Sequence, residues 1–475
     1  MKHQMSQDGY VQPHHGAQGV DARREIRAAE GDVDVGQLLD SAPFSVMQKW
    51  VVLLAAISIV IDGFDGQLIG FAIPLMIQEW GVSKNAMAPA VALGLVGMGI
   101  GSACSGLLAD RFGRRLAVIA SVWVFGTATF CIGWVSDVWA LAALRFVAGL
   151  GIGGALPVST TVAAEFTPAH RRTLAVTATI VCVPLGGMLA GLFAAEVLPR
   201  LGWRWLFYIG GTFPLLLGLM LLAVLPESPR FLARHAARWG ELRRLQARMG
   251  SPVDRAASFS NASEAQLGPR AGFLTLFQPL FLRDTVAVCL TFFMCLVAVY
   301  SAFSWLPTML TSEGLSPALA TSGLTAYNLG GVIGALVCAV VIGRWGSRWP
   351  MVVCGVGAAI SAFAMLGVNT AASPTLLVWG FGIHGLFTNA VQSTMFAVCA
   401  FIYPTSVRAR GTACGLVFGR LGAILSAFAG AAIITAYGAA GYLNLLGMAM
   451  VLATLALLLI QHPIPRRVGV VSHPV

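Results

Sequence analysis

Two carboxylates three residues apart, Asp62 and Asp65, lie near the middle of an apolar segment that runs from about Trp50 to about Met76. Side chains at i and i+3 of a helix share one face and are about 4.5 Å apart along its axis. Two carboxylates this close in a poorly hydrated site do not both ionise readily, so one is expected to hold a proton. The pair therefore has the chemistry of a proton carrier. The alternative is that one of them is a structural acid paired with a neighbouring helix.

Two arginines interrupt other apolar segments. Arg420 lies about ten residues into one such segment, near its middle, and Arg145 lies less deep in another. A guanidinium in these surroundings needs an anion, and its planar fork suits a carboxylate. We expect Arg420 either to bind an anionic substrate or to form a permanent salt bridge with one of the two aspartates. Arg420 does both, one after the other, if the substrate displaces the aspartate. We expect the same two alternatives for Arg145.

Other polar and aromatic side chains within apolar segments are weaker candidates. His384 is either a proton relay, because imidazole titrates near neutral pH, or a histidine hydrogen-bonded to a neighbouring helix. Amides and phenols can bind a ring hydroxyl and aromatic rings can sandwich a ring, although such side chains also fill helix contacts. The predicted substrate-binding residues, besides the two arginines, are Phe64, Tyr300, Tyr327, Asn328, His384, Asn389 and Gln392.

The composition is that of an integral membrane protein. Of 475 residues, 57% are hydrophobic and 11% are charged, whereas a soluble globular protein carries about 25% charged residues. The net charge of +10 comes from short loops and forms no stripe for nucleic acid. The nine cysteines have no metal-site spacing and no disulfide pattern. We find no nucleophile–base set and no phosphate loop, so the sequence predicts no enzyme, no cofactor and no metal.

Apolar stretches of about 20 residues predict an all-α integral membrane fold with twelve transmembrane helices. The expected spans are 50–77, 87–109, 116–135, 138–161, 173–196, 203–224, 285–310, 319–343, 350–369, 375–400, 411–436 and 441–461. The expected domains are a tail (1–48), a six-helix half (49–225), a central loop (226–284), a second six-helix half (285–461) and a tail (462–475).

Basic residues gather in the loops on one side of the predicted spans. Loops after the second, fourth, eighth and tenth spans carry Arg111, Arg114, Arg115, Arg171, Arg172, Arg344, Arg348, Arg408 and Arg410. The positive-inside rule therefore places both termini and the central loop in the cytoplasm.

The two halves repeat each other. At one constant spacing, Pro74 matches Pro307 and Gly81 matches Gly314. At a nearly identical spacing, Pro168 matches Pro404. Such a duplication is expected when a transporter rocks two halves about a site at the membrane midplane.

Several short motifs identify a family by resemblance. The run Gly106-Leu107-Leu108-Ala109-Asp110-Arg111-Phe112-Gly113-Arg114-Arg115 resembles the loop-2/3 signature of the major facilitator superfamily. Arg145 to Gly151 resembles its span-four motif, and Pro226 to Arg230 is also typical. Asp62-Gly63-Phe64-Asp65, Glu165-Phe166-Thr167-Pro168, Tyr403-Pro404-Thr405 and Gly419-Arg420-Leu421-Gly422 resemble the aromatic acid:proton symporters within it. Two departures are Gly343 where the first half has Asp110, and a partial antiporter signature at Val183 to Gly187.

The resemblance implies import of an aromatic carboxylate, such as a hydroxybenzoate, with protons across a bacterial inner membrane by a monomer. A nicotinate-like or sugar-like substrate, a proton-coupled exporter, and a membrane sensor that binds the acid without net transport are alternatives. Ion pairs at the cytoplasmic ends of the helices are expected to hold the closed state, although solvated loop residues would look the same. The predicted gating residues are Gly106, Asp110, Arg111, Arg114, Glu165, Arg172 and Arg408.

Overall fold

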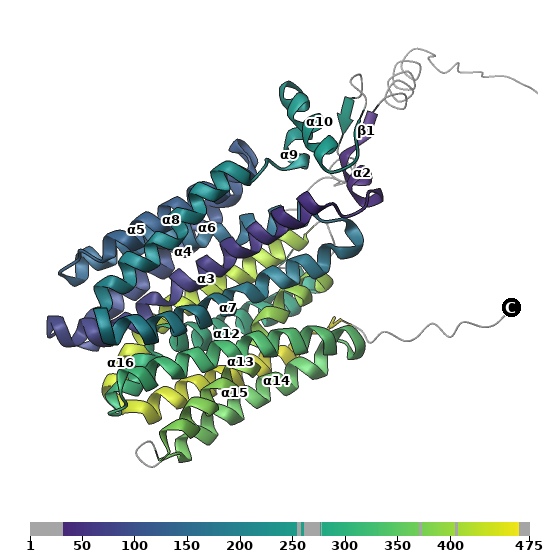
Figure 1. Cartoon of the computed structure of the whole chain (residues 1–475). Coiled ribbons are helices and arrows are strands. Elements are labelled where there is room, and N and C mark those ends of the chain that lie inside the picture. Colours follow the sequence, from purple (N-terminus) through teal and green to yellow (C-terminus); the bar gives the residue numbers. More distant parts are fainter. Residues whose placement is uncertain are drawn as a thin grey trace, which may run out of the picture.

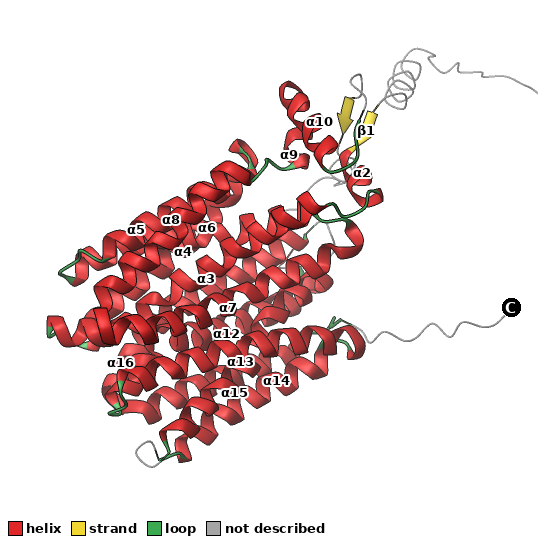
Figure 2. Ribbon diagram, viewed as in Figure 1, coloured by secondary structure: helices red, strands yellow, loops and turns green. Residues whose placement is uncertain are grey.

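Long helices run side by side through the molecule (Figures 1 and 2). The computed structural model describes residues 32–253, 258–260, 276, 278–369, 373–403 and 407–464. Ten helices within these residues are long and apolar enough to cross a membrane, and α15 is an eleventh long helix beside them. These eleven helices form two groups. The first group comprises α3 (Val46–Trp80), α4 (Lys84–Phe112), α5 (Arg114–Ile132), α6 (Val138–Phe166), α7 (Ala169–Leu201) and α8 (Trp203–Val224). The second comprises α12 (Pro279–Ser312), α13 (Pro317–Trp345), α14 (Arg348–Ala364, followed by the 3-10 turn Met365–Gly367), α15 (Pro374–Ile402) and α16 (Arg408–Leu459).

Most helices extend beyond the spans that hydropathy predicts, because capping and not apolarity decides where they end. α3 begins after Ser45, whose hydroxyl accepts the backbone N–H of Gln48 while the Gln48 side chain accepts the Ser45 N–H. It ends at Gly81, which has a left-handed φ of 65°. Gly314, the repeat partner of Gly81, has φ 84°. The helices therefore end in the same way at matched positions of the two groups.

α16 is a single element of 52 residues where the sequence predicts two spans, 411–436 and 441–461. Its backbone leaves helical geometry at Gly438, where φ is 62° and ψ is −153°. Gly202, which has φ 80°, separates α7 from α8. It precedes Gly438 by the same number of residues as Pro168 precedes Pro404. The break in α16 thus has a counterpart at a helix end in the first group.

Each group has its own internal contacts, and the groups meet along a seam. In the first, α4 packs on α6, α5 on α6 and α8, and α3 on α7. In the second, α12 packs on α16, and α13 and α14 pack on α15. The seam consists of α7 against α13, α4 against α16, and α3 against α12. A site at the seam is therefore built from both groups.

Short elements cover one end of the first group (Figure 1). The strand β1 (Asp32–Asp34) pairs in parallel with β2 (Ser258–Ser260), and α2 (Val35–Ser41), α9 (Pro229–Ala233), the 3-10 turn Ala236–Arg238 and α10 (Trp239–Arg248) pack beside them. Buried side chains of these elements join the core at the ends of α3, α5, α6 and α8. We call these short elements the cap layer.

Candidate functional site

The segment that contains the two aspartates is helical and buried. Asp62 and Asp65 lie inside α3, where 5% of Asp62 and none of Asp65 is exposed. The segment is therefore neither a turn nor exposed. Two buried carboxylates on one helix require neighbouring groups that balance their negative charge.

A cavity of about 60 Å³ lies on the seam beside Asp62. Residues of α3, α4, α6, α7, α12 and α16 line it, so both groups contribute. The charged lining residues are Asp62, Arg145 and Arg420. The other lining residues are Gly63, Gly66, Gln67, Ile69, Val91, Leu95, Met98, Ile152, Leu156, Val183, Tyr300, Phe303 and Ser304.

Asp62 and Asp65 have different neighbours. Asp62 lines the cavity. Asp65 does not, and its Oδ2 accepts a hydrogen bond of 2.9 Å from the hydroxyl of Thr129 on α5. Within the described residues, Oδ1 of each aspartate has no hydrogen-bond partner. Thr129 was not predicted, because a threonine in an apolar segment gives no signal that distinguishes it from other helix-packing residues.

The two arginines approach the cavity from different groups. Arg420 on α16 donates from Nη1 to the Tyr300 hydroxyl at 2.8 Å, and its guanidinium lies 5.8 Å from the centre of that ring. Arg145 on α6 is 95% buried and makes one long contact of 3.5 Å from Nη2 to the Gly66 carbonyl. In the described part of the chain, Nε and Nη1 of Arg145 have no partner. In that part of the chain, neither arginine forms an ion pair with Asp62 within 4.0 Å. N–H groups of the two arginines therefore remain free to bind an anion.

A pair of amides beside the cavity joins α3 of the first group to α13 of the second. Gln67 lines the cavity and is 2% exposed, and Asn328 on α13 is fully buried. Asn328 Nδ2 donates to Gln67 Oε1 at 2.7 Å, and Gln67 Nε2 donates to Asn328 Oδ1 at 3.0 Å. Asn328 was predicted from the sequence but Gln67 was missed, although an amide in the same apolar segment as two aspartates is a usable signal.

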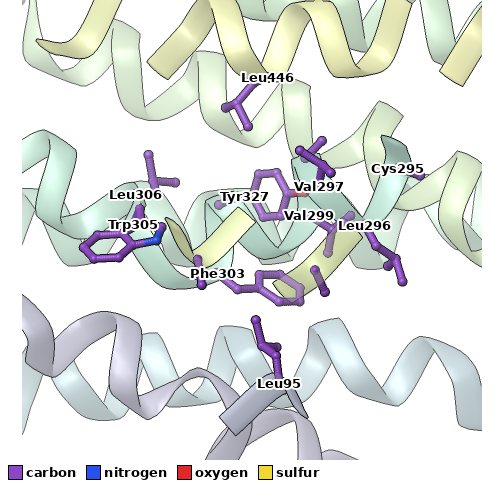
Figure 3. Close-up of a cluster of buried hydrophobic side chains, with 14 of the residues drawn as sticks. Leu95, Cys295, Leu296, Val297, Val299, Phe303, Trp305, Leu306, Tyr327 and Leu446 are labelled. Carbon is purple, nitrogen blue, oxygen red and sulfur yellow. The ribbon is translucent and has the colours of Figure 1, made fainter. Parts of the chain in front are cut away.

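The helices of the two groups pack closely along the seam between this amide pair and the end of α3. A Cβ at Gly70 would clash with the Phe303 carbonyl of α12, and one at Gly191 of α7 would lie 3.0 Å from the Thr325 Cβ of α13. Small residues allow helices to approach this closely. On the second-group side, Phe303 and Tyr327 pack edge to face with ring centres 6.0 Å apart, and Leu95 of α4 faces Phe303 (Figure 3).

The structure brings four predicted residues together at the cavity, namely Asp62, Arg145, Tyr300 and Arg420. Phe64 instead packs with Phe193 and Phe213, at ring distances of 5.4 and 5.7 Å. His384 is fully buried between α15 and α14, with Nδ1 3.0 Å from the Ala358 carbonyl. The predicted residues that do not line the cavity are Phe64, Asp65, Tyr327, Asn328, His384, Asn389 and Gln392.

Several predicted gating residues meet below the cap layer. Arg114 pairs with Asp110 at 3.0 Å and with Glu165 at 3.4 Å. The Ser228 hydroxyl donates to Glu165, and Glu227 accepts the Arg114 backbone N–H at 2.8 Å. Glu227 and Ser228 were not predicted as gating residues, although they belong to the motif that follows the sixth span. The cluster ties the ends of α4, α5 and α6 to the start of the cap layer.

The remaining gating predictions are more dispersed. Arg172 pairs with Asp40 of α2 at 3.2 Å and donates from Nε to the Ala164 carbonyl at 3.1 Å. Arg111 is exposed and stacks over the Phe112 ring at 5.3 Å, and Gly106 borders open space. Arg408 begins α16, but its side chain lies outside the described residues, as do Pro404 and Thr405.

Comparisons with known proteins agree with the motifs. The family model of the Major Facilitator Superfamily matches residues 55–326 and 288–474. The 4-hydroxybenzoate transporter PcaK of Pseudomonas putida is 35% identical over 85% of this chain and 90% of its own length, and the gallate transporter of Pseudomonas putida is 31% identical over 94% and 99%. The inward-open xylose transporter XylE from E. coli has a TM-score of 0.69 at 19% identity, over 88% of this chain and 97% of that one.

The resemblance inferred from motifs is confirmed, since these two curated relatives transport aromatic acids and the xylose transporter shares the fold. Ten apolar helices of membrane-spanning length make the protein multi-pass. The chain belongs to the major facilitator superfamily, whose members are membrane transporters rather than enzymes.

Proposed function

We propose that this protein imports an aromatic carboxylate together with protons. The observation that carries the proposal is a cavity between two helix groups at which one acid and two arginines meet. The relatives support the proposal, because proteins named as 4-hydroxybenzoate and gallate transporters match most of the chain. An anion and a proton are the two species that such a set of side chains can bind.

Different side chains at the cavity bind the carboxylate, the ring and the proton. The substrate carboxylate binds Arg420, beside the Tyr300 hydroxyl, and the uncommitted donors of Arg145. The ring packs between Phe303 and the apolar side chains of α4, such as Leu95. The proton is carried by the Asp62 and Asp65 pair.

Alternating access moves the cargo. In this proposal the halves 49–225 and 285–461 rock about the cavity, with α15 as the tenth span and α16 divided at Gly438 into the eleventh and twelfth. The termini and the loop 226–284 face the cytoplasm of a bacterial cell, and one chain suffices. The seam around Gly70 closes the outer side. The charged residues around Arg114 pair with one another within the first half in this structure, and in this proposal they close the inner side by reaching the second half.

Uptake by expressing cells tests the substrate and the coupling. A labelled panel contains 4-hydroxybenzoate, gallate, benzoate, nicotinate and xylose, each with and without a protonophore. We expect the aromatic acids to accumulate and the protonophore to abolish accumulation. Accumulation of nicotinate or xylose alone would assign another substrate class. Protonophore-resistant accumulation would contradict symport, and faster efflux than in cells without the protein would indicate an exporter.

A conservative substitution tests the anion site. Arg420→Lys replaces a planar fork with a point charge, so the apparent KM for 4-hydroxybenzoate should rise about tenfold. Arg200→Lys is the matched control, because Arg200 is 72% exposed and pairs with Glu196 away from the cavity. An unchanged KM in Arg420→Lys would mean that this arginine does not bind the substrate.

A further inference from the structure

The ionisable side chains around the cavity form a balanced set. Asp62, Arg145 and Arg420 line it, and Asp65 lies one helical turn from Asp62 on α3. The lining residues from α4 and α7 are apolar, and those from α12 are neutral. With all four groups ionised, two negative and two positive charges cancel. The empty site therefore carries no net charge.

A carboxylate substrate disturbs this balance by one negative charge. A net charge is costly in a site with little water that crosses a membrane, so the loaded site must recover neutrality. One proton on one aspartate achieves this: two arginines then face one ionised aspartate and the substrate carboxylate. A second proton would leave the loaded site with a net positive charge. The balance thus sets the proton number at one.

The geometry distinguishes the two aspartates. Asp62 lines the cavity, and its Oδ1 has no hydrogen-bond partner in the part of the chain that the structure describes. Asp65 lies behind it and accepts the Thr129 hydroxyl, a hydrogen bond that an ionised acceptor strengthens. A proton that enters through the cavity therefore reaches Asp62 first, and Asp65 keeps its charge as a counter-ion for the arginines.

We propose that each transport cycle carries one proton, held by Asp62, with one aromatic monocarboxylate, and that neither the loaded nor the empty protein carries net charge through the membrane. The inference rests on the proposed function and adds its stoichiometry. Proton and anion bind together outside and leave together inside, so the four side chains return to their initial state. The membrane potential should then not drive uptake, whereas a pH gradient should.

Proteoliposomes that contain the full-length protein separate the two driving forces. Labelled 4-hydroxybenzoate is presented with a pH gradient at zero potential, or with a potassium–valinomycin potential at equal pH. Accumulation is read before the undissociated acid enters protein-free vesicles measurably, because its passive diffusion would reach the same ratio as one-proton symport. One proton per substrate predicts about tenfold accumulation for a gradient of one pH unit, and two protons predict about a hundredfold. We expect the tenfold value and no uptake driven by the potential.

The outcomes distinguish this inference from the proposed function. Uptake that needs the pH gradient but rises with an inside-negative potential would overturn the electroneutral cycle and leave symport intact. Absence of 4-hydroxybenzoate transport under either gradient would overturn both. Benzene-1,4-dicarboxylate is a further probe with the same ring, and it should compete weakly because its second charge has no counter-ion. Competition equal to that of 4-hydroxybenzoate would contradict the charge balance.

Exchange of labelled for unlabelled substrate identifies the aspartate that carries the proton. In Asp62→Asn the amide mimics the protonated acid, so exchange should continue and its apparent KM should no longer depend on pH. In Asp65→Asn the apparent KM should still depend on pH, because Asp62 still titrates. Asp62→Glu restores a titratable group and should restore the dependence, which separates a lost proton site from a misfolded variant. The reverse pattern would assign the proton to Asp65.

Discussion

A disulfide across the seam should stop transport without altering the cavity. Gly191 on α7 and Thr325 on α13 face each other between the two helix groups, and a Cβ at Gly191 would lie 3.0 Å from the Thr325 Cβ. Disulfides have Cβ–Cβ distances of about 3.8 Å, so Gly191→Cys with Thr325→Cys needs a shift of less than about 1 Å. Replacing Thr325 also removes the hydroxyl that would otherwise contact the new Cβ.

The assay compares uptake before and after mild oxidation, and again after a reductant is added. If the seam must open to admit substrate, the fraction of uptake lost should equal the fraction of protein cross-linked, as measured by mass spectrometry. Reduction should restore uptake in full. Complete cross-linking with normal uptake would refute the alternating opening of this seam.

A matched control places the same bond inside one group. Gly154 on α6 and Ser121 on α5 would have Cβ atoms 3.7 Å apart, close to the usual disulfide value. Gly154→Cys with Ser121→Cys should therefore cross-link readily and leave uptake unchanged. The new Cβ at Gly154 would also lie 3.1 Å from the Ser105 Cβ of α4, so Gly154→Cys alone is assayed in parallel. The parent protein is oxidised in parallel, because its native Cys289 and Cys414 sulfurs are 3.7 Å apart.

Two further substitutions test hydrogen bonds that involve none of the four charged side chains at the cavity. Gln67→Leu leaves the buried Asn328 amide without its partner and should lower the initial uptake rate about tenfold, whereas Gln67→Leu with Asn328→Leu should recover most of it, because no unpaired amide remains. Additive losses in the double variant would show that the amides act separately. Glu227→Gln weakens the charged cap on the N-terminus of α5 at Arg114 and should cost about 1 kcal/mol, seen as a lower melting temperature in detergent. Glu241→Gln is its control, because the half-buried Glu241 pairs with Arg238 and caps no helix, and an equal melting temperature for both would contradict the capping role.

Hydropathy predicted most of the helices because a bilayer imposes both length and apolarity on a span. It also singled out Asp62 and Arg420, since a charge in such a span is rare and needs a reason. Both line the cavity. The motifs that carried the family resemblance were equally informative, and the comparisons confirm them.

The face that each helix presents to the cavity could not be predicted. Spans buried in protein on one side and in lipid on the other are apolar all round, so they lack the amphipathic pattern that identifies a buried face. Phe64 and His384 were therefore grouped with the cavity residues although they pack elsewhere, and Gln67 was missed. The three-residue strands of the cap layer are too short for periodicity to reveal.

The pairing of β1 with β2 has a consequence for biosynthesis. β1 precedes the first six long helices and β2 follows them, so the two strands meet only after that whole group has left the ribosome. At roughly 5–20 residues per second, β2 is synthesised roughly 11–45 s after β1. The pairing can nevertheless form before any helix of the second group has been made. The cap layer can thus join the two ends of the first group while the second group is still being translated.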